Sequence, residues 1–130
     1  MIDKIAWILL ENGRVLGTRS AGKDTYYLPG GKREPGETDV ETLVREIREE
    51  LSVDIDAASA RHVGTFEAQA HGRSSGVTVR MTCYTASFTG ELAAASEIEE
   101  LAWLTTADVD RISPVVRIIF AHLHEAGLLT

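Results

Sequence analysis

The segment TDVETLVREIREEL, residues 38–51, limits the fold more than any other part of this 130-residue chain. Thr38 and Glu41 have the spacing of a capping box, which predicts that a helix begins at Thr38. At 100° per residue, the apolar side chains of the segment share one stripe, and such a stripe packs on a core. That stripe contains Val40, Leu43, Val44, Ile47 and Leu51. The segment therefore predicts an amphipathic helix packed by one face against the rest of the protein.

Three glutamates gather on the expected outer face of this helix. Glu46, Glu49 and Glu50 are related by i, i+3 and i+4, so we expect them to cluster on the side away from the apolar stripe. Like charges at these spacings cost only about 0.2–0.5 kcal/mol per pair, so a plain solvated acidic face is one interpretation. The other interpretation is a binding site for a hard divalent cation such as Mg²⁺ or Mn²⁺, which prefers oxygen ligands.

The preceding loop, LPGGKREPGE, favours the second interpretation. Gly30 and Gly31 allow the backbone to turn sharply and to approach a ligand closely. A backbone carbonyl there can join the carboxylates as a ligand for a hard cation. A Gly-Gly pair alone is more typical of an ordinary turn, but here the carboxylate cluster follows it at a fixed distance. Together the loop and the helix predict a metal site.

The rest of the chain predicts strands and a second helix. Asn12-Gly13 between apolar runs indicates a hairpin, and residues 21–37 look like one long loop with a short apolar piece at 26–28. Ser113-Pro114 predicts the start of a helix that ends near Gly127. Strand-like patterns cover residues 4–10, 61–70, 76–90 and 100–105. These elements predict an α+β fold in which helices pack on a mixed β-sheet.

Composition excludes several classes of protein. The length fits a single domain, residues 1–130, and 44% apolar with 25% charged residues is ordinary for a globular protein. A net charge of −7 argues against binding a nucleic-acid polymer, which relies on basic surface. No run approaches the roughly 18 apolar residues of a membrane span, and the first residues do not resemble a signal peptide. The single cysteine, Cys83, permits no internal disulfide and suits the cytoplasm.

The loop and the helix together resemble the Nudix hydrolase family, in particular its small, single-domain, MutT-like bacterial-type members. The family pattern runs over 23 residues, from Gly31 through Glu37 to REIREELSV at 45–53, with matching spacing throughout. Ser52 stands where the family has a glycine that ends the helix, which puts the geometry of the helix exit in question. The strand order, LPGG and ELAWLT extend the likeness over most of the chain. The resemblance implies the Nudix fold, an α/β/α sandwich with a mixed β-sheet.

The resemblance also implies roles for residues of the loop and the helix. Three carboxylates match the metal ligands of the family, and Gly30 matches a position whose carbonyl can bind the metal. The metal implied is Mg²⁺, for which Mn²⁺ can substitute. Gly31, Glu37 and Arg45 match residues that support the site structurally. The three matched metal ligands are Glu46, Glu49 and Glu50.

The reaction implied by the resemblance is the hydrolysis of a nucleoside diphosphate linked to another group. Water attacks one phosphorus atom of the diphosphate, and a general base is needed to take its proton. Glu49 or Glu50 of the helix can serve, and some family members use a glutamate from a later loop. In ASEIEELAW we prefer Glu97 over Glu100 by its distance before Trp103. An acidic turn without a chemical role is the alternative for both residues.

The substrate is predicted by elimination. GTFEAQAHG, residues 64–72, lacks the proline and the tyrosine that mark ADP-ribose and dinucleoside polyphosphate hydrolases, and no coenzyme A motif is evident upstream. Nucleoside triphosphates are left, including oxidised ones such as 8-oxo-dGTP, with a nucleoside diphosphate linked to a sugar as the alternative. Arg19, Lys23 and Tyr27 flank the loop and are candidates for contacting the substrate, although each also fits an ordinary surface or packing residue.

Two other kinds of protein stay as alternatives to an enzyme. One is a catalytically silent Nudix domain that binds a nucleotide, although such domains usually lack one of the carboxylates that this chain keeps. The other is an unrelated acidic helix that serves as a protein interface. The expected partner is a small-molecule nucleotide, with neither a nucleic-acid polymer nor a membrane. Many members of the family are dimers, so a homodimer is compatible with the sequence.

Overall fold

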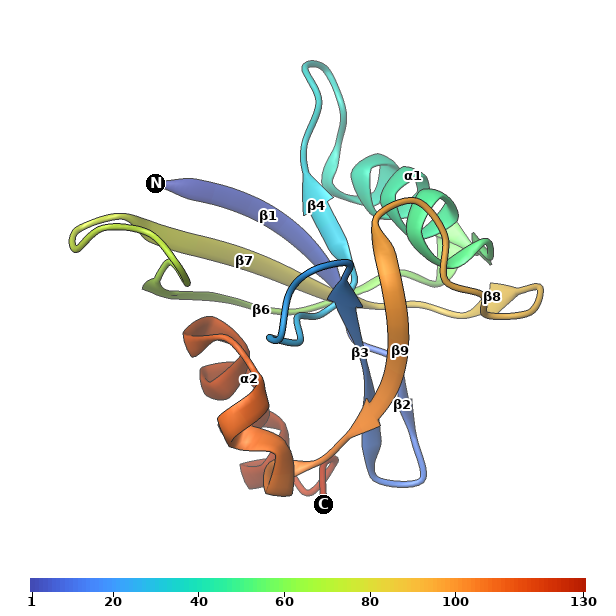
Figure 1. Cartoon of the computed structure of the whole chain (residues 1–130). Helices are drawn as coiled ribbons and strands as arrows, with labels where there is room; N and C mark the ends of the chain where they lie inside the picture. Colours follow the sequence, from blue (N-terminus) through green and yellow to red (C-terminus); the bar gives the residue numbers. More distant parts are fainter.

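The computed structural model describes all residues, 1–130, and centres on a four-stranded sheet with the order β4-β1-β7-β6 (Figure 1). Its strands are β1 (Ile2–Trp7), β4 (Gly30–Lys32), β6 (Arg61–Gln69) and β7 (Thr78–Thr85). β1 runs antiparallel to β4 and parallel to β7, and β7 runs antiparallel to β6. The sheet is therefore mixed, as the sequence predicted.

Two smaller sheets complete the strand content. β2 (Leu10–Glu11), β3 (Arg14–Ser20) and β9 (Ile98–Leu104) form a three-stranded antiparallel sheet in the order β2-β3-β9. β5 (Asp54–Ile55) pairs with β8 (Phe88–Thr89). Through its pairing with β3, the late strand β9 lies beside a strand from the first twenty residues. This pairing brings the segment before Ile98 close to the glycine loop.

Two helices lie on opposite sides of the strands (Figure 1), α1 (Asp39–Leu51) and α2 (Pro114–Glu125). Two short 3-10 turns, η1 (Ala57–Ser59) and η2 (Thr106–Arg111), precede β6 and α2. The expected capping box is present, because the Thr38 side chain accepts from the N–H of Glu41 and the Glu41 side chain accepts from the N–H of Thr38. Neither helix is long and apolar enough to cross a membrane.

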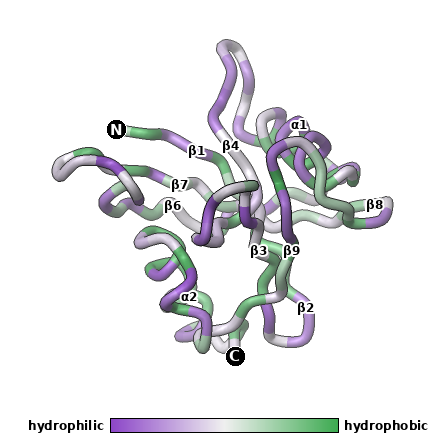
Figure 2. Tube along the Cα trace, viewed as in Figure 1, coloured by the Kyte–Doolittle hydropathy of each residue, from purple (hydrophilic) through white to green (hydrophobic).

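Each helix covers its own apolar core. The alternation of side chains along β1 separates the two cores, because Ile5 and Trp7 pack with α1 whereas Ala6 packs with α2. Figure 2 shows hydrophobic and hydrophilic residues mixed along both helices and a largely hydrophilic loop between β4 and α1. The predicted stripe of α1 is buried through Leu43, Ile47 and Leu51. Two helical layers around a mixed sheet confirm the predicted α+β sandwich.

Several predicted boundaries are wrong, and one turn is confirmed. Asn12 and Gly13 have φ of 53° and 75° and close the β2–β3 hairpin as expected. The region 21–37 is not all loop, because β4 pairs with β1 through Ile5↔Gly31. The single strand predicted over 76–90 is two strands, β7 and β8. The first strand covers Ile2–Trp7 rather than residues 4–10, and the last covers Ile98–Leu104 rather than residues 100–105. Glycine-rich β4 was missed because it pairs through its backbone and carries no side-chain alternation.

Candidate active site

Two glycines of the loop lie in close contact with neighbouring elements. Gly30 has a φ of 149°, and a Cβ atom there would lie 2.0 Å from the carbonyl oxygen of Ile5. A Cβ atom on Gly31 would lie 2.5 Å from the carboxyl carbon of Glu46. At Gly30 the obstacle is backbone, so a side chain would force the loop away from β1, whereas at Gly31 a side chain would displace the Glu46 carboxylate. The missing Cβ atoms let the loop lie directly against β1 on one side and against α1 on the other.

A bidentate ion pair fixes this loop to the helix. Arg45 donates from Nε to Oε2 of Glu37 at 2.7 Å and from Nη2 to Oε1 at 2.9 Å. Glu37 also accepts from the backbone N–H of Glu34 and from the hydroxyl of Thr42. The hydrogen bonds from Arg45 lower the pKa of Glu37 to about 2, so this carboxylate stays ionised well into acid. The ion pair therefore holds the loop in a fixed position relative to the helix.

Arg45 also reaches the carboxylates of α1. It donates from Nη1 to Oε1 of Glu46 at 2.8 Å and from Nη2 to the carbonyl of Lys32 at 3.1 Å. Glu34 and Glu49 lie 3.5 and 3.6 Å from the same Nη1 atom. The hydrogen bonds that Arg45 donates to Glu37 are the main cause that raises the pKa of Arg45. The guanidinium is therefore a fixed positive charge among four glutamates.

The three glutamates of α1 have very different surroundings. Glu50 is only 6% exposed and accepts a hydrogen bond of 3.1 Å from the backbone N–H of Gly30. The side chain of Glu46 is 16% exposed, and that of Glu49 is 54% exposed. Burial, with a smaller contribution from the charge of Glu46, raises the pKa of Glu50 to about 8. Burial also raises the pKa of Glu46.

The prediction that all three glutamates lie on the outer side of α1, away from its apolar stripe, is therefore wrong for Glu50. β4 covers this side of α1, so Glu50 points inward to the loop and not to solvent. Nor do the three carboxylates converge, because Arg45 lies against Glu46 and Glu49 is exposed. No group of three acidic, histidine or cysteine side chains is arranged to hold a metal ion.

The residues themselves nevertheless fit a hard cation. A buried carboxylate with one hydrogen bond from a neutral donor is costly, because burial disfavours the charged form. Glu50 is such a group, since its only hydrogen bond comes from the N–H of Gly30. A cation beside it would restore the ionised form, and the nearby carboxylate of Glu46 supplies further oxygen donors. The donor set is therefore chemically suited to Mg²⁺ or Mn²⁺.

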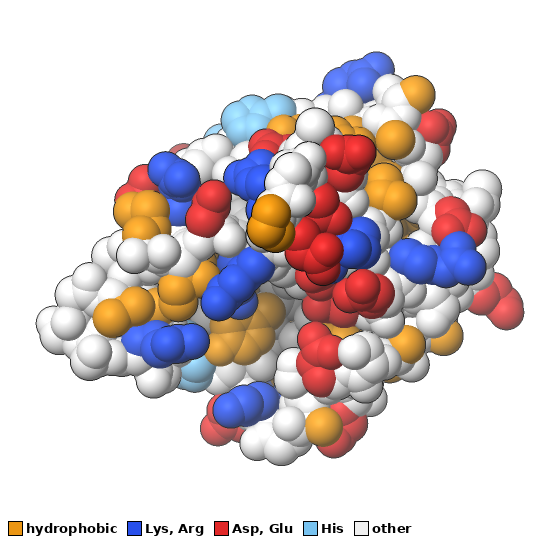
Figure 3. Space-filling view, turned by 90° about the horizontal axis from the view of Figure 1, so that it is seen from above, with side chains coloured by type: hydrophobic (Ala, Val, Ile, Leu, Met, Phe, Trp, Pro, Cys, Tyr) orange, Lys and Arg blue, Asp and Glu red, His pale blue; other side chains and the backbone are white.

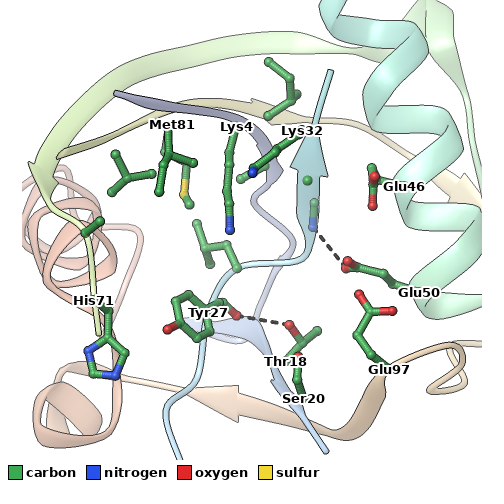
Figure 4. A pocket seen from close by; sticks show the side chains of 18 of the residues that line it. Lys4, Thr18, Ser20, Tyr27, Lys32, Glu46, Glu50, His71, Met81 and Glu97 are labelled. Atoms are coloured by element: carbon green, nitrogen blue, oxygen red, sulfur yellow. Dashed lines mark hydrogen bonds between the residues drawn. The ribbon is translucent and has the colours of Figure 1, made fainter. Parts of the chain in front are cut away.

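A pocket of about 550 Å³ opens beside these carboxylates. Figure 4 shows Glu46, Glu50 and Glu97 on one side of it, with Lys4 and Tyr27 facing them. In the space-filling view of Figure 3, a hollow with an apolar floor lies between a band of acidic side chains and a group of basic ones. The volume is in the range of pockets that hold small-molecule ligands and cofactors.

Among the later glutamates, only Glu97 lines the pocket. Its side chain accepts from the hydroxyl of Ser96 at 2.5 Å, and this hydrogen bond lowers the pKa of Glu97. Glu100 instead accepts from the hydroxyl of Tyr26 and lies 3.7 Å from Arg19. The structure therefore separates the two candidates for the base, with Glu97 at the pocket and Glu100 tied elsewhere.

The three candidates for contacting the substrate are also separated. Tyr27 lines the pocket, where its ring meets that of His71 at a centroid distance of 6.1 Å. Arg19 does not line it, because its guanidinium binds Glu99 at 2.9 Å and the carbonyl of Lys23 at 3.0 Å. Lys23 is exposed and likewise outside the lining. Only Tyr27 of these three is placed to contact a ligand in the pocket.

Sequence reasoning missed several lining residues, among them Lys4, His71, Arg73 and Met81. A signal was available for Lys4, because the alternation of β1 puts Lys4 on the same face as Ala6 and opposite to Ile5. The residues from β7 and the β6–β7 turn had no such signal, since only the parallel pairing of β1 with β7 brings them to the pocket.

Ser52 ends α1 in the conformation that the family pattern assigns to glycine. Its φ and ψ are 64° and 21°, and its N–H donates to the carbonyl of Arg48 at 3.1 Å. Its hydroxyl donates to the carbonyl of Ala93 at 3.3 Å. The helix exit is therefore kept despite the substitution, with Ser52 in the left-handed region that costs a non-glycine residue roughly 1–2 kcal/mol.

Comparisons with known proteins agree with this geometry. A model of the NUDIX domain matches residues 3–123 of the chain. The CTP pyrophosphohydrolase of Escherichia coli strain K12 is 36% identical over 77 residues, which are 56% of this chain and 56% of that protein. An RNA pyrophosphohydrolase of Halorhodospira halophila is 46% identical over 43 residues, which are 33% of this chain and 24% of that protein. The chain thus spans about half or less of these relatives.

A solved structure extends the likeness to the whole chain. The solution structure of the Escherichia coli ORF135 protein is 27% identical in sequence and superposes with a TM-score of 0.73. The alignment covers 97% of this chain and 92% of that one. The arrangement of sheets and helices is therefore common to both proteins.

Proposed function

The chain belongs to the NUDIX family, and on this premise we propose that it is a Mg²⁺-dependent pyrophosphohydrolase that cleaves the diphosphate linkage of a nucleoside triphosphate, oxidised forms included. The observation that carries the proposal is the buried carboxylate of Glu50, which borders a pocket of about 550 Å³ together with Glu46 and Glu97. The pyrophosphohydrolase names of both curated relatives support the same reaction class.

A free nucleotide suits the pocket better than the end of an RNA chain. The volume is of the size that encloses one small ligand. The chain carries a net charge of −7, so its surface offers little of the basic area that holds a nucleic-acid backbone. We therefore assign a small-molecule substrate, even though one relative is named for RNA.

The carboxylates of Glu46, Glu49 and Glu50, with the carbonyl oxygen of Gly30, are the groups that would hold the cation. A bound cation would polarise the phosphoryl oxygens, lower the pKa of water and stabilise the leaving phosphate. Arg45 keeps the helix and the loop in register through Glu37. The exposed Glu49 completes the set only if its side chain turns towards Glu46.

Glu97 is the residue that we assign as the general base. It lines the pocket, and the hydrogen bond from Ser96 keeps its carboxylate ionised at neutral pH. It would take a proton from the attacking water as the water oxygen bonds to phosphorus and the bridging P–O bond breaks. Tyr27, also on the pocket wall, offers an aromatic face to the base or the sugar.

A hydrolysis screen with Mg²⁺ tests this function. The screen would compare normal and oxidised nucleoside triphosphates, nucleotide sugars, ADP-ribose and dinucleoside polyphosphates, with phosphate and pyrophosphate release read separately. We expect one class of triphosphate to be hydrolysed and Glu50→Gln to abolish turnover. No turnover of any compound, with nucleotide binding that Glu50→Gln leaves unchanged, would instead indicate a silent binding domain.

Two further variants test the assignment of the base. Glu97→Gln is expected to lower kcat by about 10²–10⁴-fold with little change in KM, which is the usual contribution of a general base. Glu100→Gln is the control. It removes the same charge as Glu97→Gln, but from a glutamate that is bound to Tyr26 and Arg19 instead of lining the pocket. A large loss of kcat in Glu100→Gln, with none in Glu97→Gln, would overturn the assignment.

A further inference from the structure

Lys4 is a cation that the fold places inside the pocket. Along β1, Ile5 and Trp7 are buried beneath α1, so the alternate residues Ile2, Lys4 and Ala6 face the other way and line the pocket. Figure 4 shows the Lys4 side chain extended into the pocket, beside the strand that carries Gly30 and opposite the carboxylates. Its Nζ lies 5.9 Å from the centre of the Tyr27 ring.

The ammonium of Lys4 has no anionic or hydrogen-bonding partner in the protein, and its contact is with the face of the Tyr27 ring. It forms no ion pair and no side-chain hydrogen bond, although its side chain is partly buried. A partly buried charge without a partner is unfavourable, and burial accordingly lowers the pKa of Lys4. Most arginines near the site are paired, as Arg45 is with Glu37 and Arg19 with Glu99. Lys4 is therefore free to bind a ligand.

Two more unpaired cations lie on the same side of the pocket. Lys32 and Arg73 line it and are exposed, and neither takes part in an ion pair. Acidic residues outnumber basic ones in this protein, so most basic side chains could find an acidic partner. Three basic side chains without an ion pair around one pocket therefore call for a specific reason. Glu46, Glu50 and Glu97 line the opposite side of the pocket (Figure 4). An anionic ligand in this pocket would need metal cations between itself and the carboxylates on one side. On the other side the basic residues could bind it directly.

We propose that Lys4 is a substrate-binding residue whose ammonium donates to a non-bridging oxygen of a substrate phosphate, on the side of the pocket opposite the carboxylates. This inference rests on the proposed function, because it presumes a phosphorylated substrate. Lys4 is the cation best suited to the role, since it is more buried than Lys32 and Arg73 and a charged hydrogen bond is stronger where water is excluded. Lys32 and Arg73, being exposed, add attraction at the pocket rim.

Binding of imidodiphosphate tests the proposal without knowledge of the nucleobase. Its bridging nitrogen resists hydrolysis, and calorimetry in Mg²⁺ gives its Kd for each variant. Lys4→Met removes the charge and keeps the length of the side chain, Lys4→Gln keeps a polar group, and Lys4→Arg keeps the charge. Arg14→Met is the matched control, because Arg14 is exposed at the start of β3 and does not line the pocket.

We expect the Kd for imidodiphosphate to rise about tenfold or more in Lys4→Met and Lys4→Gln, the usual effect of losing a charged hydrogen bond. Lys4→Arg should restore most of the affinity, and Arg14→Met should match the original protein. With a hydrolysed substrate, KM should rise in Lys4→Met by a similar factor while kcat changes less. A role limited to balancing the charge of Glu50 would not produce this pattern.

A Kd within about twofold of the original value in both Lys4→Met and Lys4→Gln would overturn the proposal, since a lost hydrogen bond to a charged group costs more than that. Melting temperatures of all four variants confirm that each is folded. Failure of the proposed function looks different, because the unchanged protein would then hydrolyse nothing. In that case a loss of imidodiphosphate binding in Lys4→Met would still support Lys4 as a phosphate-binding residue.

Discussion

The backbone N–H of Gly30 donates a hydrogen bond of 3.1 Å to Oε1 of Glu50, which joins the glycine loop to the buried carboxylate of the helix. The bond exists because Gly30 lies directly against β1, with its φ of 149° and no side chain. The same residue also carries the carbonyl oxygen that we assign to the cation. The conformation of one residue thus determines two contacts of the site.

Gly30→Ala is expected to disrupt the site and to destabilise the fold. The new Cβ would lie 2.0 Å from the carbonyl oxygen of Ile5, so the loop must move away from β1. Overpacking and backbone strain together should lower the free energy of unfolding by about 3 kcal/mol or more. Urea denaturation measures this change. Gly22→Ala is the control, because Gly22 also has a positive φ of 77° but its Cβ would meet no atom within 4 Å. Equal losses in both variants would contradict the packing argument.

Ser52→Gly is expected to stabilise the protein. Ser52 holds a φ of 64°, which glycine adopts without strain, and the loss of its hydroxyl contact with Ala93 offsets part of the gain. The net effect should be about 0.5–1 kcal/mol in the free energy of unfolding. Ser52→Ala keeps the strain and loses the hydroxyl, so it should be less stable than the original protein. If the glycine variant is no more stable than the alanine variant, the strain at this exit is negligible.

Glu37 is expected to make stability depend on pH in acid. Its pKa is about 2 in the folded protein, against 4.5 for an ordinary glutamate, because Arg45 binds the ionised form. A lowered pKa contributes stability that is complete above pH 4.5 and is lost as the pH falls from 4.5 towards 2. The difference in unfolding free energy between the original protein and Glu37→Gln should therefore shrink over this range. A difference that stays constant from pH 6 to pH 2.5 would exclude this ion pair as the cause.

How far the sequence predicts this protein depends on the kind of contact involved. The α1 helix and the Asn12-Gly13 hairpin were predictable, because capping, periodicity and turn preference act over a few residues. The inward orientation of Glu50 was not, because helical geometry alone does not show that β4 covers that side of α1. Pairing across distant strands likewise brings Lys4 and Glu97 to one pocket. Local pattern identifies the carboxylates, and tertiary packing decides which of them is buried.

Mg²⁺ is expected to raise the melting temperature through Glu50. Ligand that binds only the folded state stabilises by RT ln(1 + [L]/Kd), so Mg²⁺ at ten times its Kd should add about 1.4 kcal/mol, or about 5 °C for a chain of this size. Glu50→Gln should lose this shift while remaining at least as stable without metal, because the amide avoids burying a charge. Calorimetric melting with EDTA and with increasing Mg²⁺ measures both effects.

Glu91→Gln provides the control for this experiment, because Glu91 is exposed and does not line the pocket. It changes the net charge by the same amount, so any general effect of Mg²⁺ on an acidic protein appears equally in both variants. The predicted result is a shift in Glu91→Gln like that of the original protein and none in Glu50→Gln. Equal shifts in all three proteins would mean that Mg²⁺ acts on the overall charge and that Glu50 does not bind it.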